Sequence, residues 1–347
     1  MKQVKQIILV WLFILPGIAF SNVEIFAQGG VETKIYKGMC DASAAVALDE
    51  NTFIVANDED NDLRVFDKNN PIELQRIKLS EIFKDKIFDG NNLEIDIEGA
   101  TRLGDKIFWT GSHSASKNGK ARPSRHRLFA VNISSDEKTG KFIAVPVGRI
   151  YTELISELEN EPRFKDFKLN EAQDIKPKDI GGLSIEGLAA TPTGHLLIGF
   201  RNPLLGGQTT PDKILINGKS LIVELINPLE VVEGKPAKFA APIILDLGGF
   251  GFRGLEYDNT RNRYLIVAGP YFDKQEVLSQ NSEAAEARLY LWSGKRADQP
   301  QLQKIINLSG FNAETAFVYQ KTGIVQLFSD DGKTNCIAGF RSWLLKF

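Results

Sequence analysis

Acidic residues recur at one position of a repeated sequence motif. The motif opens segments such as DIEGATRL and SIEGLAAT, and the recurring residues are Asp41, Glu98, Glu186, Glu256 and Glu314. Five converging carboxylates repel one another, so they need a cation, hydrogen-bond donors or protonation. Calcium is the natural cation because it accepts several oxygen ligands in a flexible geometry. The motif therefore fits two arrangements: the carboxylates cap backbone N–H groups or pair with Arg64, Arg102, Arg201 and Arg253, or they bind a calcium ion.

Basic residues are concentrated in one segment, residues 111–127, which contains His113, Arg122 and Arg125. Guanidinium groups match the oxygens of phosphate and carboxylate, and a histidine can move protons near pH 7. We therefore expect Arg122 and Arg125 to bind an anionic ligand and His113 to act as a general acid or base. The alternative is a solvated loop. Further candidate ligand-binding residues stand at the start of later loops: Arg201, Asn202 and Tyr271.

The elements that must position these residues are repeated short strands. Each acidic position is followed by apolar stretches such as IFWT and RLFAV, separated by polar loops. Repeats of this length and alternation are typical of propeller blades. We predict an all-β fold, a β-propeller of five four-stranded blades. Six blades are the alternative, because the segment at about 151–180, where we expect a helical insertion, could conceal strands.

The fifth blade has only three strand patterns at the C-terminal end of the chain. The segment VETKIYKG, residues 31–38, precedes the first repeat and is predicted to supply the missing outer strand. A ring closed in this way has no open seam. Antiparallel pairing of this segment with SWLLKF would bring Cys40 beside Cys336, and we expect a disulfide between them.

Residues 1–21 have the pattern of a secretory signal peptide. Lys2 and Lys5 precede an apolar run, and Ala19 and Ser21 are small residues near a cleavage site after Ser21 or Ala27. We expect a secreted or periplasmic protein whose mature domain spans residues 22–347. No later apolar run reaches the roughly 18–20 residues of a membrane span. The formal net charge of −2 gives no reason to expect nucleic-acid binding.

Several segments together resemble a known family. DASAAVAL, DIEGATRLGDKIFWTGSHS, SIEGLAATPTGHLLIGFRNP and RNRYLIVAGPY look like an uncharacterised bacterial family known only as a domain of unknown function. The resemblance covers nearly all of the mature chain and implies a propeller without an established reaction. SIEGLAATPTG is also similar to the esterase-like phytase family, which implies phosphoesterase activity.

Two functions from different classes follow. The first is a secreted propeller that binds a small-molecule or anionic ligand, or a partner, on the face carrying the acidic residues and the loops between second and third strands. The second is a calcium-dependent hydrolase of an anionic ester or a lactone. A propeller fold hosts both, so the sequence does not decide whether the protein is an enzyme, and it predicts no oligomeric state.

Overall fold

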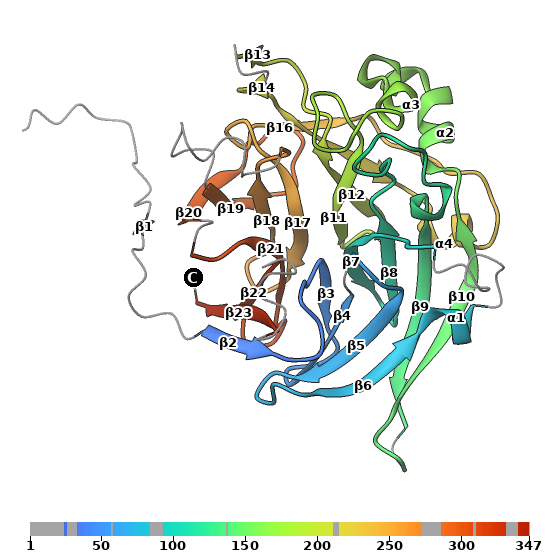
Figure 1. Ribbon diagram of the computed structural model, residues 1–347, viewed down its shortest axis with the longest axis vertical. Coiled ribbons are helices and arrows are strands. Elements are labelled where there is room, and N and C mark those ends of the chain that lie inside the picture. Colours follow the sequence, from blue (N-terminus) through green and yellow to red (C-terminus); the bar gives the residue numbers. More distant parts are fainter. Residues whose placement is uncertain are drawn as a thin grey trace, which may run out of the picture.

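The chain forms a ring of five blades around a central axis, as the computed structural model shows (Figure 1). The structure describes residues 24–25, 33–56, 58–83, 93–136, 138–210, 215–272, 286–307, 310–330 and 339–346. Five sheets of at least four strands account for the blades, which confirms the predicted five-bladed propeller.

The first three blades follow one another along the chain. Blade 1 contains β3 (Ala44–Ala47), β4 (Thr52–Ala56), β5 (Asp62–Asp67) and β6 (Glu73–Lys78). Blade 2 contains β7 (Ile97–Leu103), β8 (Lys106–Gly111), β9 (Leu128–Ser135) and β10 (Phe142–Tyr151). Blade 3 contains β11 (Ser184–Ala190), β12 (Leu196–Asn202), β15 (Ser220–Leu225) and β16 (Ile243–Leu245), and a small ribbon of β13 (Gln208–Thr209) and β14 (Leu215–Ile216) extends one of its loops.

The last two blades complete the ring. Blade 4 contains β17 (Gly251–Asp258), β18 (Arg263–Gly269), β19 (Glu286–Trp292) and β20 (Gln301–Asn307), with β1 (Glu24–Ile25) parallel to β20. Blade 5 contains β21 (Ala313–Val318), β22 (Val325–Ser329), β23 (Phe340–Leu345) and β2 (Thr33–Tyr36). Antiparallel pairing of β2 with β23 confirms that an N-terminal strand closes the last blade.

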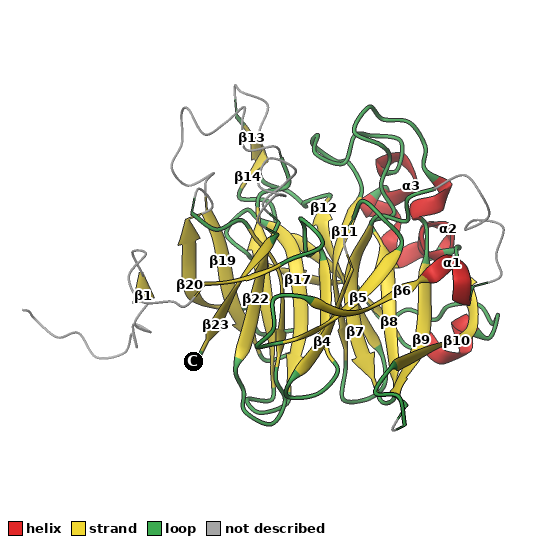
Figure 2. Cartoon of the chain, turned by 60° about the horizontal axis from the view of Figure 1, so that its bottom comes forward, coloured by secondary structure: helices red, strands yellow, loops and turns green. Residues whose placement is uncertain are grey.

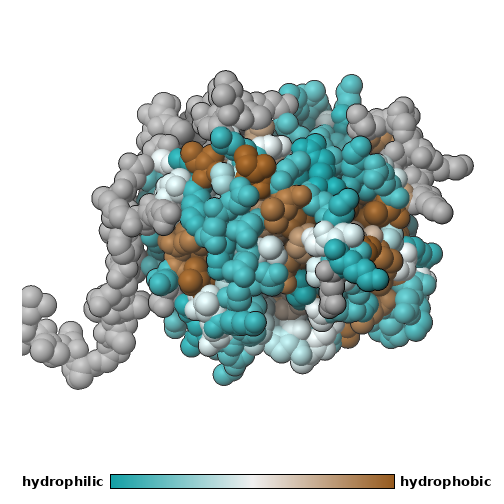
Figure 3. Space-filling view, turned by 90° about the horizontal axis from the view of Figure 1, so that it is seen from below, coloured by the Kyte–Doolittle hydropathy of each residue, from teal (hydrophilic) through white to brown (hydrophobic). Residues whose placement is uncertain are grey.

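Hydrophobic side chains fill each of the five interfaces between blades. Inner strands such as β11 are buried along their whole length because a neighbouring blade covers each face. The seam between blades 5 and 1 is aromatic: the Tyr36 ring lies 5.0 Å from Phe53, 5.4 Å from Phe66 and 5.3 Å from Phe340. On the outer side of the ring, apolar residues are scattered among hydrophilic ones (Figure 3).

Short helices lie outside the blades, most of them on one side of the ring (Figure 2). They are α1 (Leu79–Ile82), α2 (Leu154–Asn160), α3 (Leu169–Ala172) and α4 (Pro228–Val232), with 3₁₀ turns at Pro123–Arg125 and Pro162–Phe167. The predicted helical insertion therefore exists. Its residues Leu154, Ile155 and Leu158 are buried against blades 2 and 3. None of the helices in the described part of the chain is long and apolar enough to span a bilayer.

The register of the closing strand bears on the predicted disulfide. Tyr36 pairs with Phe340 and Thr33 with Trp343. Cys336 lies outside the described residues, so the disulfide stays a prediction.

A β-bulge marks the same place on four inner strands. The pairing of first and second strands shifts around one extra residue, which is Glu98, Glu186, Arg253 or Glu314. A glycine follows three of these residues because the next blade is close: a Cβ atom at Gly99 would lie 3.0 Å from the Cβ of Leu188. In blade 4 the repeated position is therefore Arg253. Glu256 lies three residues further along β17 and is not equivalent to the other glutamates.

We expect truncation of Tyr36 to weaken the whole ring. Tyr36→Ala removes a ring that contacts three phenylalanines and a hydroxyl that donates to the Lys68 carbonyl oxygen at 2.7 Å. The expected loss is about 3–5 kcal/mol of unfolding free energy, measured by urea denaturation. Ile35→Ala on the same strand is the control, because Ile35 is 41% exposed and should change stability by less than about 1 kcal/mol. Equal effects would contradict this role for the aromatic seam.

Glu256 should make the stability depend on pH. Burial raises its pKa to about 8, and Asp258 adds repulsion, although Gln320 and Arg102 act in the opposite direction. The folded state then holds this proton between about pH 4.5 and pH 8 while the unfolded state releases it, so the stability falls as the pH rises through this range. At pH 8.5 the Glu256→Gln variant should melt at a higher temperature than the wild type, by about 2 °C for each 1 kcal/mol of unfolding free energy gained. At pH 5 the difference in melting temperature between the two proteins should be smaller. Glu171→Gln, at a side chain that is 71% exposed, is the control and should show no such pH-dependent difference.

Candidate functional site

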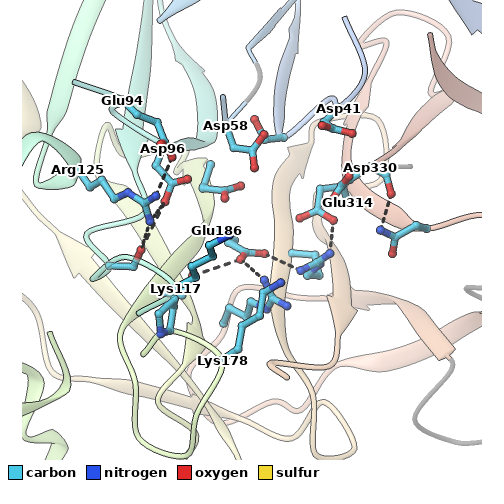
Figure 4. Close-up of a pocket in the computed structure, with 18 of the residues that line it drawn as sticks. Asp41, Asp58, Glu94, Asp96, Lys117, Arg125, Lys178, Glu186, Glu314 and Asp330 are labelled. Carbon is cyan, nitrogen blue, oxygen red and sulfur yellow. Dashed lines mark hydrogen bonds and ion pairs between the residues drawn. The ribbon is translucent and has the colours of Figure 1, made fainter. Parts of the chain in front are cut away.

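A cavity of about 330 Å³ lies where the inner strands of all five blades begin (Figure 4). The acidic residues that line it are Asp41, Asp58, Glu94, Asp96, Glu98, Glu186, Glu314 and Asp330. The basic residues that line it are Lys117, Arg125, Lys178, Arg201 and Arg253. Eight acidic against five basic side chains leave a formal excess of three negative charges in this cavity.

Two tiers of repeated positions supply much of the lining. The first tier holds the residues at the bulge and the equivalent residue of blade 1: Ser43, Glu98, Glu186, Arg253 and Glu314. The second tier lies two residues earlier and contributes Asp41, Asp96, Ser184 and Asn312. Side chains two apart on a strand share a face, so blades 1, 2, 3 and 5 present both positions to the axis, whereas blade 4 has Gly251 at the second. Arg201 of β12 also lines the cavity, and the rest of the lining comes from connections between strands, among them Asp58, Glu94 and Asp330.

The carboxylates form two overlapping groups whose oxygens approach closely enough to hold one metal ion. One group is Asp58, Asp96 and Glu98, and the other is Glu98, Glu186 and Glu314. Within each group the ligand oxygens lie within 4.8 Å of one another. Glu98 belongs to both groups, and this places it at the centre of the acidic surface.

Burial and mutual repulsion raise the pKa of several of these groups. Burial, with repulsion from Glu186 and Asp96, raises the pKa of Glu98 well above its usual value. Burial raises the pKa of Glu314 to about 8 although Arg253 opposes the shift. Burial likewise raises the pKa of Asp96 to about 7, against the effect of Arg125, and that of Asp58 to about 6, with help from Asp330. A cation in the cavity would remove this repulsion.

Arginines neutralise part of the acidic surface. Arg253 forms ion pairs with Glu314 and, at 3.4 Å, with Glu186 Oε2. Burial opposes the charge of Arg253, but these carboxylates outweigh that effect and raise its pKa. Arg201 Nη1 lies 2.7 Å from Glu186 Oε1, so Glu186 has two arginine partners. Across the cavity from Glu314 (Figure 4), Arg125 pairs with Glu94 at 2.7 Å and with Asp96 at 2.8 Å.

Some carboxylate oxygens at the cavity lack a hydrogen-bond donor. Among the described residues Glu98 has neither a hydrogen bond nor an ion pair. Asp58 Oδ1 is buried and accepts no hydrogen bond from a described residue. Glu186 is 2% exposed, and its Oε2 accepts no hydrogen bond but lies 3.4 Å from Arg253 Nη1 in an ion pair. Buried polar atoms without a partner are costly, so Asp58 Oδ1, with the neighbouring carboxylate of Glu98, marks where a bound cation would be stabilised.

The backbone and side chains around Asp96 hold this residue in place. Asp96 has a φ of 59°, in the left-handed region that non-glycine residues rarely adopt. Its Oδ2 accepts a short hydrogen bond from Ser112 Oγ, and Ser114 Oγ lies 3.4 Å from the same oxygen. Such strain is sustained only where the surroundings fix the residue, as the Ser112, Ser114 and Arg125 contacts do here.

The structure brings most of the predicted site residues to the cavity. Asp41, Glu98, Glu186, Glu314, Arg125 and Arg201 all line it. Asn202 does not: its side-chain amide donates to the carbonyl oxygens of Pro177 at 3.0 Å and Asp179 at 2.7 Å. Asn202 therefore positions the connection that carries Lys178 into the cavity.

The other predicted site residues lie elsewhere. Glu256 is outside the lining, where Gln320 donates to it at 3.3 Å. His113 is fully buried outside the lining, and burial lowers its pKa well below the usual value. Arg122 is exposed, away from the lining. The Tyr271 hydroxyl accepts from the Leu215 amide at 2.7 Å, while the neighbouring residue Phe272 reaches the cavity.

Sequence reasoning missed Asp96, Glu94 and Lys178 as lining residues. A signal for Asp96 was present, because aligning DASAA with DIEGA makes Asp41 equivalent to Asp96 and Ser43 equivalent to Glu98. Glu94 and Lys178 lie in connections between blades, which do not repeat. No pattern in the sequence could have found these two.

Comparison with known proteins adds a family but no activity. No curated protein matches the sequence. Among solved structures, the chain is similar to a glutaminyl cyclase from Myxococcus xanthus, with 9% identity, a TM-score of 0.45 and coverage of 90% of this chain and 94% of that one. It is also similar to the β-propeller domain of Cps50 (Swd1) from Myceliophteria thermophila, with 8% identity, a TM-score of 0.39 and coverage of 92% and 100%.

A family model matches residues 41–147 and 132–304, which include the inner strands of blades 1 to 4. The chain therefore belongs to the family described as protein of unknown function (DUF3616).

Proposed function

We propose that this propeller binds a small anionic ligand in the axial cavity, with a calcium ion linking the ligand to the carboxylates. One observation carries the proposal: the two carboxylate groups converge on Glu98, for which no counter-ion is found in the described part of the chain. Calcium takes six to eight oxygen ligands, so three protein carboxylates would leave positions open for oxygens of a bound carboxylate or phosphate. Lys117 and Lys178 also line the cavity and favour an anion there.

The predicted signal peptide agrees with this proposal. A protein exported through such a segment meets a compartment outside the cytoplasm, and extracellular modules bind calcium with millimolar to submillimolar affinity. Residues 1–21 lie outside the described residues, so export remains part of the proposal. We therefore propose that the protein is a secreted or periplasmic binding protein.

The alternative function is a calcium-dependent hydrolase of an anionic ester, such as the phosphoesters of the phytase-like family, or of a lactone. The same carboxylates could hold the metal that polarises the scissile group. The proton carrier expected for such a hydrolase, His113, is not among the residues that line the cavity. The geometry therefore favours binding over catalysis. Turnover of a phosphoester or lactone that stops when calcium is removed would reverse this preference.

Calcium binding should depend on Glu98. Calorimetric titration of metal-stripped protein should show a binding event that Glu98→Gln weakens at least 100-fold, because the substitution removes the one charge shared by both carboxylate groups. Glu256→Gln is the matched control, since Glu256 is also a glutamate of an inner strand but lies outside the cavity. It should leave the affinity unchanged. Absence of binding by the wild type, or equal binding by the Glu98 variant, would reject the proposed site.

A further inference from the structure

Blade 4 differs from its neighbours at the bulge position, where blades 2, 3 and 5 have glutamate. Arg253 reaches the glutamates of both flanking blades: it pairs with Glu186 of blade 3 and with Glu314 of blade 5. Its side chain is 7% exposed, so these charges interact with little screening by solvent. Blade 4 therefore has a permanent cation at the position where these three blades have an acid.

The two carboxylate groups therefore differ in how far the protein itself neutralises them. In the group of Glu98, Glu186 and Glu314, two members are paired with arginines. In the group of Asp58, Asp96 and Glu98, only Asp96 has an arginine partner, and Arg125 shares its charge between Asp96 and Glu94. The second group keeps more uncompensated negative charge.

We infer that Arg253 takes the place of a metal ion in one half of the cavity, so that the protein binds a single divalent cation in the other half, between Asp58, Asp96 and Glu98. This inference rests on the proposed function and assigns the position of its ion. A cation beside Arg253 would be repelled by its guanidinium group and by that of Arg201. In the other group Arg125 is the only arginine that forms an ion pair, with Asp96, and Asp58 and Glu98 form none with any described residue. Blades 1 and 2 then hold the metal.

The position of the ion also predicts where the anionic groups of a ligand would bind. An anion bound to a metal between blades 1 and 2 can extend across the cavity toward Arg253 and Arg201, whose charges lie on blades 4 and 3. Lys178 lines the same cavity. The ligand class that fits is a small molecule with two anionic groups, one bound to the calcium ion and the other directed at the arginines.

The stoichiometry of calcium binding tests the role of Arg253. The wild type should bind one ion, and Arg253→Gln should bind two, because Glu186 and Glu314 lose their shared cation. Restoring the charge balance with Glu314→Gln in the Arg253→Gln background should return the count to one. Arg253→Gln with one ion and unchanged affinity would overturn the inference.

A second set of variants keeps the test decisive if Arg253→Gln fails to fold without metal. The triple variant Arg253→Gln, Glu186→Gln, Glu314→Gln removes the arginine and both of its partners, so no unpaired charge remains there. It should bind one calcium ion, and adding Asp58→Asn should weaken that binding at least tenfold. A triple variant that no longer binds calcium would place the ion at Glu186 and Glu314 instead and overturn the inference.

Failure of the proposed function gives a different result. If the wild type binds no calcium but Arg253→Gln binds one ion, the role of Arg253 as a substitute cation is supported while the calcium-linked ligand site is rejected. If neither binds calcium, both are rejected.

Discussion

Repulsion between carboxylates at the axis of a closed ring is the constraint on which the site depends. Glu98, Glu186 and Glu314 come from three different blades, yet their oxygens lie within 4.8 Å of one another. They approach because each stands at a bulge that turns one extra residue of an inner strand toward the axis. Like charges so close, and largely shielded from water, are stable only with a compensating charge or a proton. The chain supplies part of that compensation through Arg253 and Arg201.

The ring can impose this proximity because its ends are joined. Each inner strand is fixed by hydrophobic contacts with two neighbouring blades, and an open seam would let the first and last blades move apart. The seam is closed by β2, whose Tyr36 packs among phenylalanines of blades 5 and 1. Blade 5 carries Glu314 and blade 1 carries Ser43 and Asp58, so the seam also sets the geometry of the cavity.

The repeat predicted the fold but not the details of the site. Five copies of one strand pattern, together with VETKIYKG as the missing strand, were enough for the blade number and the closure. The register of blade 4 was wrong because FRGLEY contains a glutamate three residues after the true position, and hydrophobic alternation alone does not fix where a bulge falls. His113 was expected at the cavity from its residue type, but its backbone, with a φ of 55°, places the ring in the interior. Contacts of that kind depend on tertiary structure and leave no local pattern.

Arg253 also bears on whether the cavity is a structural or a ligand-binding feature. If the acidic ring served only to hold a structural ion, five acidic positions with no buried arginine would bind that ion most tightly. An arginine at one position lowers the affinity for metal but allows the ring to close without it, because Glu186 and Glu314 are neutralised in the folded chain. The carboxylates of Asp58, Asp96 and Glu98 still cost stability in the empty state, which their raised pKa values express, and Glu314 shares this cost because burial raises its pKa although Arg253 opposes the shift. A fold that closes without an ion, yet keeps one group of carboxylates in which Asp96 alone has an arginine partner, fits the proposed ligand site better than a purely structural one.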